Sequence, residues 1–207
     1  MRSTASATRS SSLARGAALA ALLLLAPAAP AAPALAASFE ERTALCLACH
    51  GPNGQSLIPD TPSIGGQPFF FVVAQLFLFR RGGRANAAMS EVAKPMTDDD
   101  LRAFGDWVAK LPPPKPPAEP ADPARIKRGA ALVLQRPCTS CHNPDFSGRE
   151  QMPRLAHQRE EYLLRAMREY KSGARVGYGS SMTEELVGLS DADLQDLAYF
   201  LAHLPTR

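Results

Sequence analysis

The sequence predicts an all-α protein made of two similar domains that are joined by a proline-rich linker. Three observations lead to this fold class. The pentad CLACH at residues 46–50 returns as CTSCH at residues 138–142, 92 positions later, and the chain has no other cysteine. Elsewhere, apolar residues recur at the spacings of three and four that are typical of helices, and no alternating strand pattern persists. Seven prolines lie within residues 111–123, between the two copies.

The N-terminal residues 1–37 are expected to be a cleaved signal peptide rather than part of the fold. A basic start precedes a short apolar run, and small residues follow around Ala36 and Ala37. An uncleaved membrane anchor is the alternative, but the run is short for a span and prolines follow it closely. No later stretch is long and apolar enough to cross a bilayer. We therefore expect an exported, periplasmic protein that is soluble after cleavage.

The charge balance gives no reason to expect nucleic acid as a partner. The whole chain has 23 Lys and Arg against 20 Asp and Glu. Three arginines of the predicted leader, Arg2, Arg9 and Arg15, account for all of this excess. The mature chain is therefore expected to be neutral, without the basic surface that attracts nucleic acid.

Residues 38–111 and 124–207 are the two predicted domains, and they are related by a tandem duplication. When Cys46 is aligned with Cys138, the offset between matched residues stays between 91 and 93. Copies of about 80 residues bury few apolar side chains, so each needs something large and apolar to fill its core. The matched pairs include Pro62 and Pro153, Gln67 and Gln158, Phe71 and Tyr162, Arg84 and Arg175, and Met89 and Met182.

Helices are predicted at equivalent places in both copies. Each copy ends in a helix whose N-cap, Thr97 or Ser190, lies three residues before an aspartate. The linker, residues 112–123, is expected to hold neither a helix nor an interior strand because of its prolines. The expected helices are 39–45 (short), 69–79 (more apolar than a surface helix should be) and 101–111 in the first copy, and 125–135, 160–170 and 194–204 in the second.

Each pentad is a CxxCH motif, which is the attachment signature of c-type haem. Two thiols three residues apart on one helical turn can bond the two vinyl groups, and the next histidine can ligate iron from one face. Two covalent haem c groups would then fill the two small cores. The first haem would be held by Cys46, Cys49 and His50, and the second by Cys138, Cys141 and His142.

Other readings of the four cysteines are weaker. In an exported chain they would allow two disulfides, or one zinc ion held by four thiolates. Neither explains why a histidine directly follows both pairs. A thioredoxin-like redox pair needs a βαβ context, which this helical pattern lacks.

The sixth ligand of each iron decides what a haem can do, because a thioether raises the reduction potential and closes the iron to outside ligands. Methionines usually pack in cores. Only Met89 and Met182 match each other in the duplication, 39 and 40 residues after their histidines. This recurrence predicts them as axial ligands, in preference to the unmatched Met96, Met152 and Met167.

At these residues the sequence resembles class I cytochromes c, and its doubled arrangement is similar to dihaem cytochrome c4. The resemblance covers nearly all of residues 38–207. It rests on the early CxxCH, a proline about twelve residues later, a helix followed by Gly-x-Arg, the methionine and the capped last helix. It implies two helical domains related by pseudo-twofold symmetry, with their haem edges facing each other.

The resemblance also implies supporting roles for residues near the haems. The carbonyls of Pro62 and Pro153 would accept a hydrogen bond from the proximal histidines and so orient the rings. Arg84 and Arg175 would lie near the haem propionates, although ordinary surface charge is an alternative for both arginines. Two further histidines are expected to be surface or packing residues and not ligands, namely His157 and His203.

The function that the resemblance implies is electron transfer, without catalysis, among redox proteins of a respiratory chain. By analogy, electrons would arrive from a quinol-oxidising complex and leave to a haem–copper terminal oxidase of the cbb type. We expect a monomer, and this expectation is compatible with peripheral association of the protein with a membrane. One rival is a dihaem enzyme such as a thiosulfate dehydrogenase or peroxidase, which would need an open iron. Others are a subunit dedicated to one dehydrogenase or reductase, and a gas sensor.

Overall fold

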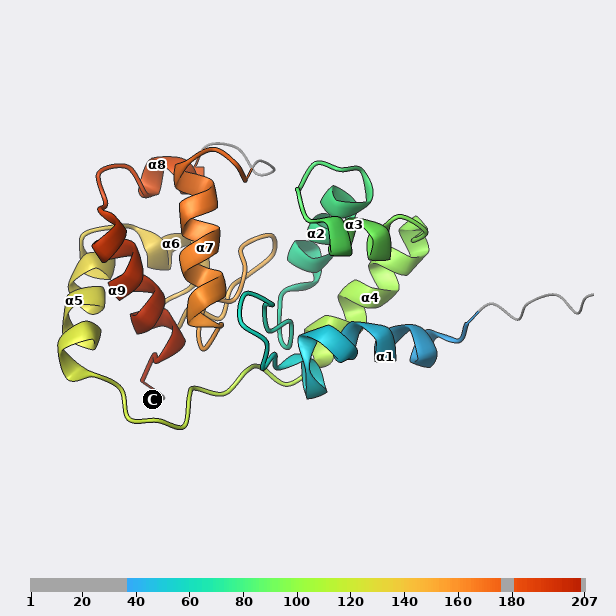
Figure 1. Cartoon of the computed structure of the whole chain (residues 1–207), viewed down its shortest axis with the longest axis horizontal. Coiled ribbons are helices and arrows are strands. Elements are labelled where there is room, and N and C mark those ends of the chain that lie inside the picture. The colour runs from blue at the N-terminus through green and yellow to red at the C-terminus, as the bar shows by residue number, and fades with distance from the viewer. Residues whose placement is uncertain (1–36, 176–180, 206–207) are drawn as a thin grey trace, which may run out of the picture. The chain divides into compact units, whose positions relative to one another are not determined.

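Helices form both copies in the computed structural model, which describes residues 37–175 and 181–205 (Figure 1). Within these residues there is no strand, only an isolated bridge between Arg149 and Met152. The all-α prediction is therefore confirmed. The first copy contains α1 (Phe39–His50), a 3-10 turn (Pro52–Gly54), α2 (Phe69–Arg80), α3 (Ala87–Ala93) and α4 (Asp98–Lys110). The second contains α5 (Pro123–Leu134), α6 (Cys138–His142), α7 (Glu160–Lys171), α8 (Ser181–Glu185) and α9 (Asp191–Ala202).

The predicted signal peptide lies outside the described residues, apart from Ala37. Across residues 37–175 and 181–205, none of the helices has the length and apolarity that a membrane span requires. From Ala37 onward the chain forms one compact unit.

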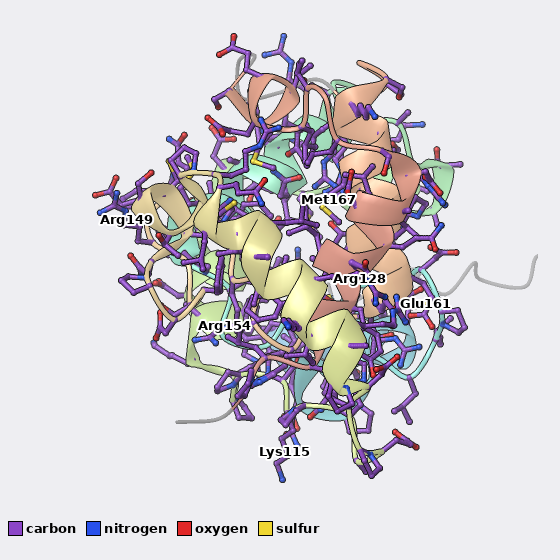
Figure 2. All side chains as sticks on the ribbon, turned by 90° about the vertical axis from the view of Figure 1, so that its left-hand side faces the viewer. Lys115, Arg128, Arg149, Arg154, Glu161 and Met167 are labelled. Carbon is purple, nitrogen blue, oxygen red and sulfur yellow. The ribbon has the colours of Figure 1, made fainter. Side chains whose placement is uncertain are left out.

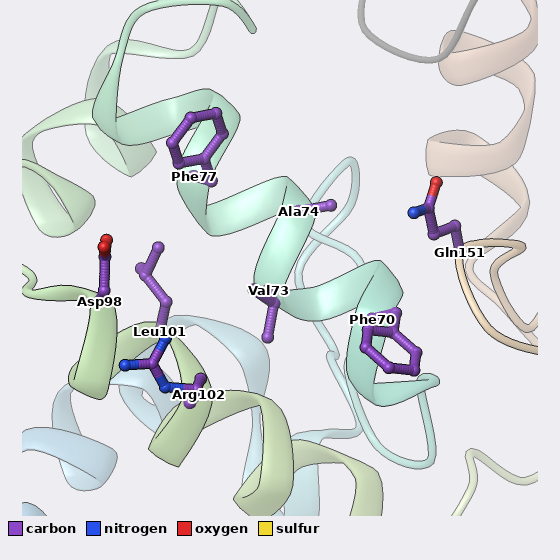
Figure 3. A pocket seen from close by; sticks show the side chains of 8 residues that line it. All are labelled: Phe70, Val73, Ala74, Phe77, Asp98, Leu101, Arg102 and Gln151. Atoms are coloured by element: carbon purple, nitrogen blue, oxygen red, sulfur yellow. The ribbon is translucent and has the colours of Figure 1, made fainter.

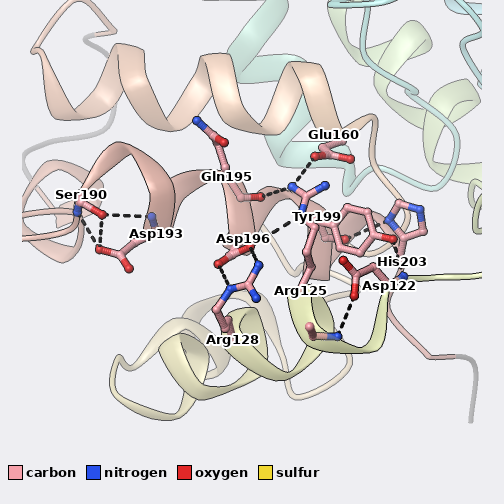
Figure 4. A network of polar contacts seen from close by, with 11 residues as sticks. Asp122, Arg125, Arg128, Glu160, Ser190, Asp193, Gln195, Asp196, Tyr199 and His203 are labelled. Atoms are coloured by element: carbon pink, nitrogen blue, oxygen red, sulfur yellow. Dashed lines mark hydrogen bonds and ion pairs between the residues drawn. The ribbon is translucent and has the colours of Figure 1, made fainter.

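The last helix of each copy, α4 or α9, begins with the N-cap that the sequence predicts. The Thr97 hydroxyl accepts a hydrogen bond from the Asp100 amide, and the Asp100 carboxylate accepts one from the Thr97 amide. Ser190 and Asp193 repeat this capping box at the start of α9 (Figure 4). Such reciprocal bonds satisfy amides that have no partner within the helix.

The two pentads differ in how they join the preceding helix. α1 continues through residues 46–50, whereas Pro137 separates α5 from α6 in the second copy. Proline has no amide hydrogen and clashes with the preceding turn, so the helix cannot continue through it. The sequence predicts only a short helix, 39–45, before Cys46, but α1 continues through the pentad and, with 12 residues, is as long as α5.

One boundary of the predicted linker is wrong, because Pro123 belongs to α5. The Asp122 carboxylate accepts a hydrogen bond from the Ala124 amide and caps the helix there. Proline is favoured in the first turn of a helix, where its missing amide hydrogen costs nothing. No helix is present between Leu111 and Asp122, in agreement with the rest of the prediction.

Each copy has its own apolar core. In the first, α2 packs against α3 and α4 around Phe79, Ala93, Met96, Leu101 and Phe104. In the second copy, α9 packs against α5 and α7 around a larger set of buried apolar residues. Met167 is buried in this core, whereas Arg128 is exposed at the surface of the protein (Figure 2). That set is Phe146, Ala156, Leu163, Met167, Leu186, Leu189, Leu194, Leu197, Ala198, Phe200 and Leu201.

A polar network fixes α5 against α9 along the edge of the second core (Figure 4). Arg125 lies over the Tyr199 ring, 3.8 Å from its centroid, and pairs with Glu160 at 2.8 Å. Arg128 pairs with the Asp196 carboxylate at the surface. The guanidinium groups therefore add directional contacts to an otherwise apolar helix crossing.

The crossing of α5 and α9 requires a glycine at position 129. A Cβ atom on Gly129 would lie 2.4 Å from the Phe200 Cβ and 2.5 Å from the Asp196 carbonyl oxygen. Both neighbours belong to α9, and one of them is backbone, so neither can move aside cheaply. The two helices can approach this closely only because the side chain is missing.

We predict that Gly129→Ala destabilises the folded protein by about 1–3 kcal/mol, because it overpacks the crossing. The sign of the stability change is informative, because helix propensity alone would favour alanine over glycine by about 1 kcal/mol. Chemical denaturation followed by circular dichroism measures the change. Ala131→Gly, at an exposed position of the same helix, is the control and should cost only the propensity difference. A more stable Gly129→Ala variant would contradict the predicted close packing.

Candidate functional site

The chain leaves each pentad through the same left-handed turn. Gly51 and Asn143, the residues after the two histidines, have φ angles of 78° and 68°. A Cβ on Gly51 would lie 2.0 Å from the Gln55 carbonyl oxygen, so glycine is needed there. Asn143 adopts nearly the same φ with an extended ψ of 156°, a conformation that is uncommon for a residue with a side chain. The turn directs the following loop back across the histidine ring in both copies.

The loop brings a proline carbonyl to the Nδ1 atom of each pentad histidine. The distance is 2.8 Å from His50 to Pro62 and 2.9 Å from His142 to Pro153. A carbonyl can only accept, so Nδ1 carries the proton and Nε2 keeps its lone pair. Burial lowers the pKa of both histidines, against the opposing effect of the carbonyl contacts. Neutral imidazole is the form that ligates a metal.

The Nε2 atom of His142 is buried and has no hydrogen-bond partner within the part of the chain that the structure describes. A buried polar nitrogen without a partner costs free energy, so such an atom points to an interaction that protein atoms do not supply. Ligation of a haem iron is such an interaction, and the Nδ1–carbonyl contact is the orienting bond that ligating histidines typically have. The residues therefore fit a c-type haem.

The cysteines also fit haem attachment better than the alternatives. All four thiols, Cys46, Cys49, Cys138 and Cys141, are free. Within residues 37–175 and 181–205, no group of three or more His, Cys, Asp or Glu is placed to hold a metal ion. A zinc site built from the two pairs is therefore not formed.

Each matched methionine lies against the same apolar core as the cysteine of its own copy. Cys46 and Met89 both pack on the first core, and Cys138 and Met182 both pack on the second. By contrast, two unmatched methionines are members of the cores themselves: Met96 is 7% exposed and Met167 is 8% exposed. This placement supports Met89 and Met182 as the ligands.

Arg84 and Arg175 converge on one hydroxyl group, that of Tyr162. Their Nη2 atoms lie 3.1 Å and 3.4 Å from the tyrosine oxygen. Burial would raise the pKa of Tyr162, but the positive charges of Arg175 and Arg84 lower it to about 8. Sequence reasoning gave Tyr162 no role. The only signal was its alignment with Phe71, which has no hydroxyl group.

The other two histidines have packing roles, as predicted. The ring nitrogens of His157 lie 3.2 Å from the Pro114 carbonyl oxygen and 2.8 Å from that of Leu204, so this ring connects the linker to the C-terminal segment. His203 stacks on the Tyr199 ring with centroids 4.0 Å apart (Figure 4).

A hollow of about 360 Å³ lies on the surface of α2, where the sequence is unusually apolar (Figure 3). Phe70 and Phe77 are exposed at this hollow, so some of the apolar side chains that make α2 unusually apolar are not buried in the core. None of its lining residues is a predicted haem ligand. They are Phe70, Val73, Ala74, Phe77, Asp98, Leu101, Arg102 and Gln151. A second hollow, of about 540 Å³, lies beside Cys141.

Known proteins are similar to this chain in both sequence and fold. The family model described as cytochrome c matches residues 126–205. The chain is 32% identical to the thiosulfate dehydrogenase electron acceptor of Thiomonas intermedia over 172 residues, which are 78% of this chain and 79% of that relative.

The chain belongs to the cytochrome c family.

Two further comparisons extend the likeness to both copies. Cytochrome c4 of Thiocapsa roseopersicina is 29% identical over 168 residues, 77% of this chain and 87% of the relative. The crystal structure of reduced cytochrome c4 from Pseudomonas stutzeri matches with a TM-score of 0.72 at 27% identity, covering 79% of this chain and 95% of that chain. The protein is therefore a dihaem class I cytochrome c that carries covalent haem c at both CxxCH motifs and transfers electrons.

The predicted axial methionines, Met89 and Met182, can be tested one at a time. We predict that Met89→Ala and Met182→Ala each remove about half of the weak near-infrared sulfur-to-iron absorption band of the oxidised protein. Each variant should also lower the potential of its own haem, since the thioether is lost.

Met96→Ala is the matched control, because it truncates a buried methionine of the first core and should leave the band whole. If Met96→Ala removes the band and Met89→Ala does not, the ligand assignment in the first copy is wrong.

Proposed function

We propose that the protein is a periplasmic carrier that passes electrons between redox proteins of a respiratory chain, with His/Met coordination at both irons. The observation that carries this proposal is the arrangement of each copy. In each copy a buried histidine is held through Nδ1, and a methionine packs on the same apolar core as an attachment cysteine. Ligation by both side chains would leave neither iron with an open position for a substrate. The axial pairs are His50 with Met89 and His142 with Met182.

The haem supplies the redox chemistry when bound, and the chain fixes its surroundings. The Pro62 and Pro153 carbonyls hold the two histidine rings in one tautomer and one orientation. The methionine thioethers favour the reduced iron and exclude outside ligands. Two strong axial ligands in a packed core require little rearrangement when an electron arrives, which suits a carrier.

Arg84 and Arg175 are proposed to neutralise the haem propionates between the two copies. The Arg175 side chain is buried, and its Nη1 atom has no hydrogen-bond partner among residues 37–175 and 181–205. The Glu169 carboxylate lies 3.8 Å from this atom. A buried guanidinium with an unused donor fits a carboxylate ligand. Tyr162, which both arginines contact, would hold the two guanidinium groups in place.

The proposed route runs from a quinol-oxidising complex to a haem–copper terminal oxidase of the cbb type. A second candidate donor is a thiosulfate dehydrogenase, because a relative that is 32% identical is named as the electron acceptor of that enzyme. In either route the chain carries electrons and does not itself oxidise thiosulfate.

Mixing experiments distinguish the two donors. We expect the oxidised protein to be reduced within milliseconds to seconds by catalytic amounts of a quinol-oxidising complex with its quinol, followed by stopped-flow absorbance of the haem. The reduced protein should then be reoxidised by a cbb-type oxidase in air. Thiosulfate without an added dehydrogenase should reduce neither haem. Reduction by a thiosulfate dehydrogenase alone, with no reaction at the quinol-oxidising complex, would replace the first route by the second.

A further inference from the structure

Two buried glutamines connect the copies through a reciprocal pair of hydrogen-bond clamps. The Oε1 atom of Gln158 accepts from the Ser63 amide at 2.7 Å, and its Nε2 atom donates to the Ser63 carbonyl at 2.7 Å. Gln67 does the same to Arg154, with both distances 3.0 Å. The glutamines match each other in the duplication, and so do the two residues that they clamp.

The clamped residues directly follow the prolines that orient the iron-binding histidines. The peptide group between Pro62 and Ser63 accepts from His50 through its carbonyl and donates to Gln158 through its amide. One planar peptide therefore joins a histidine of the first copy to a glutamine of the second. In the opposite direction, the peptide after Pro153 joins His142 to Gln67.

Hydrogen bonds arranged in such a chain polarise one another. When a glutamine oxygen accepts from the peptide amide, the carbonyl of the same peptide becomes a stronger acceptor for the histidine Nδ1 proton. A stronger Nδ1 bond makes the imidazole a more basic ligand, which favours ferric iron and lowers the potential. Ser63, Gln67 and Gln158 are 3%, 5% and 3% exposed, so water does not screen the chain.

We propose that each glutamine is a positioning residue for the haem of the other copy: Gln158 lowers the potential of the first haem and Gln67 that of the second. This inference rests on the proposed ligation by His50 and His142. It makes the two potentials depend on the contact between the copies. The interface is then part of each haem's ligand environment and not only a way of joining two carriers.

The experiment uses the full-length holoprotein and replaces each glutamine by methionine, which has a similar length but no amide. Redox titration gives two potentials, and Met89→Ala and Met182→Ala assign them, since each lowers the potential of its own haem. We expect Gln158→Met to raise the potential of the first haem and leave the second unchanged, and Gln67→Met to do the reverse. Gln195→Met, at an exposed position of α9, should move neither.

A spectroscopic reading separates this role from packing alone. In the reduced Gln158→Met variant, the Nδ1 proton resonance of His50 should shift and exchange faster with solvent, while that of His142 keeps its position. A shift of the potential in the glutamine's own copy, an equal shift of both, or no shift would overturn the proposal. If instead neither methionine variant lowers a potential, ligation by Met89 and Met182 fails, and the proposed function with it. The glutamine proposal, which needs only the histidine ligands, then stands or falls on whether each glutamine variant raises one potential and leaves the other unchanged.

Discussion

The hydrogen bond between each pentad histidine and a proline carbonyl is the constraint on which the rest of the structure depends. It fixes the proton on Nδ1 and leaves the lone pair on Nε2, which for His142 is buried and has no hydrogen-bond partner among the described residues. Burying a nitrogen without a hydrogen-bond partner costs free energy unless the nitrogen ligates iron. Both copies have a residue with positive φ directly after the histidine. The loop that follows it brings the proline carbonyl back to the histidine ring.

Duplication has produced equivalent sites with unequal surroundings. The loops match closely: Gly66 and His157 occupy the same place with φ angles of 63° and 60°. Around them the copies diverge. The second core is larger, and Tyr162 brings together arginines from both copies where Phe71 has no hydroxyl group to do so. Because haem potentials respond to burial, charge and hydrogen bonding, two identical haems in this chain are held in different electrostatic environments.

The elements that depend on local chemistry could be predicted from the sequence. The pentads, the capped terminal helices and the linker each follow from neighbouring residues. The alignment of the copies also selects Met89 and Met182 as ligands, and this assignment stays a prediction. Even the break at Pro137 follows from the rule for proline inside helices. The glutamine clamps could not be predicted in this way, since Gln67 and Arg154 are far apart in the chain and meet only when the copies pack together. Their recurrence in the alignment was visible, but a shared glutamine carries no chemical signature of its own. The same holds for Tyr162.

We propose that both irons are closed by protein ligands, which would make the molecule a carrier and not a catalyst. Carbon monoxide binds ferrous haem only where the sixth position is open or easily vacated, so it tests this claim directly. The measurement is the absorption spectrum of the fully reduced, unmutated protein before and after saturation with carbon monoxide. We expect no change at either haem. A carbon monoxide spectrum at one or both haems would show a naturally open iron and would contradict the claim for that copy.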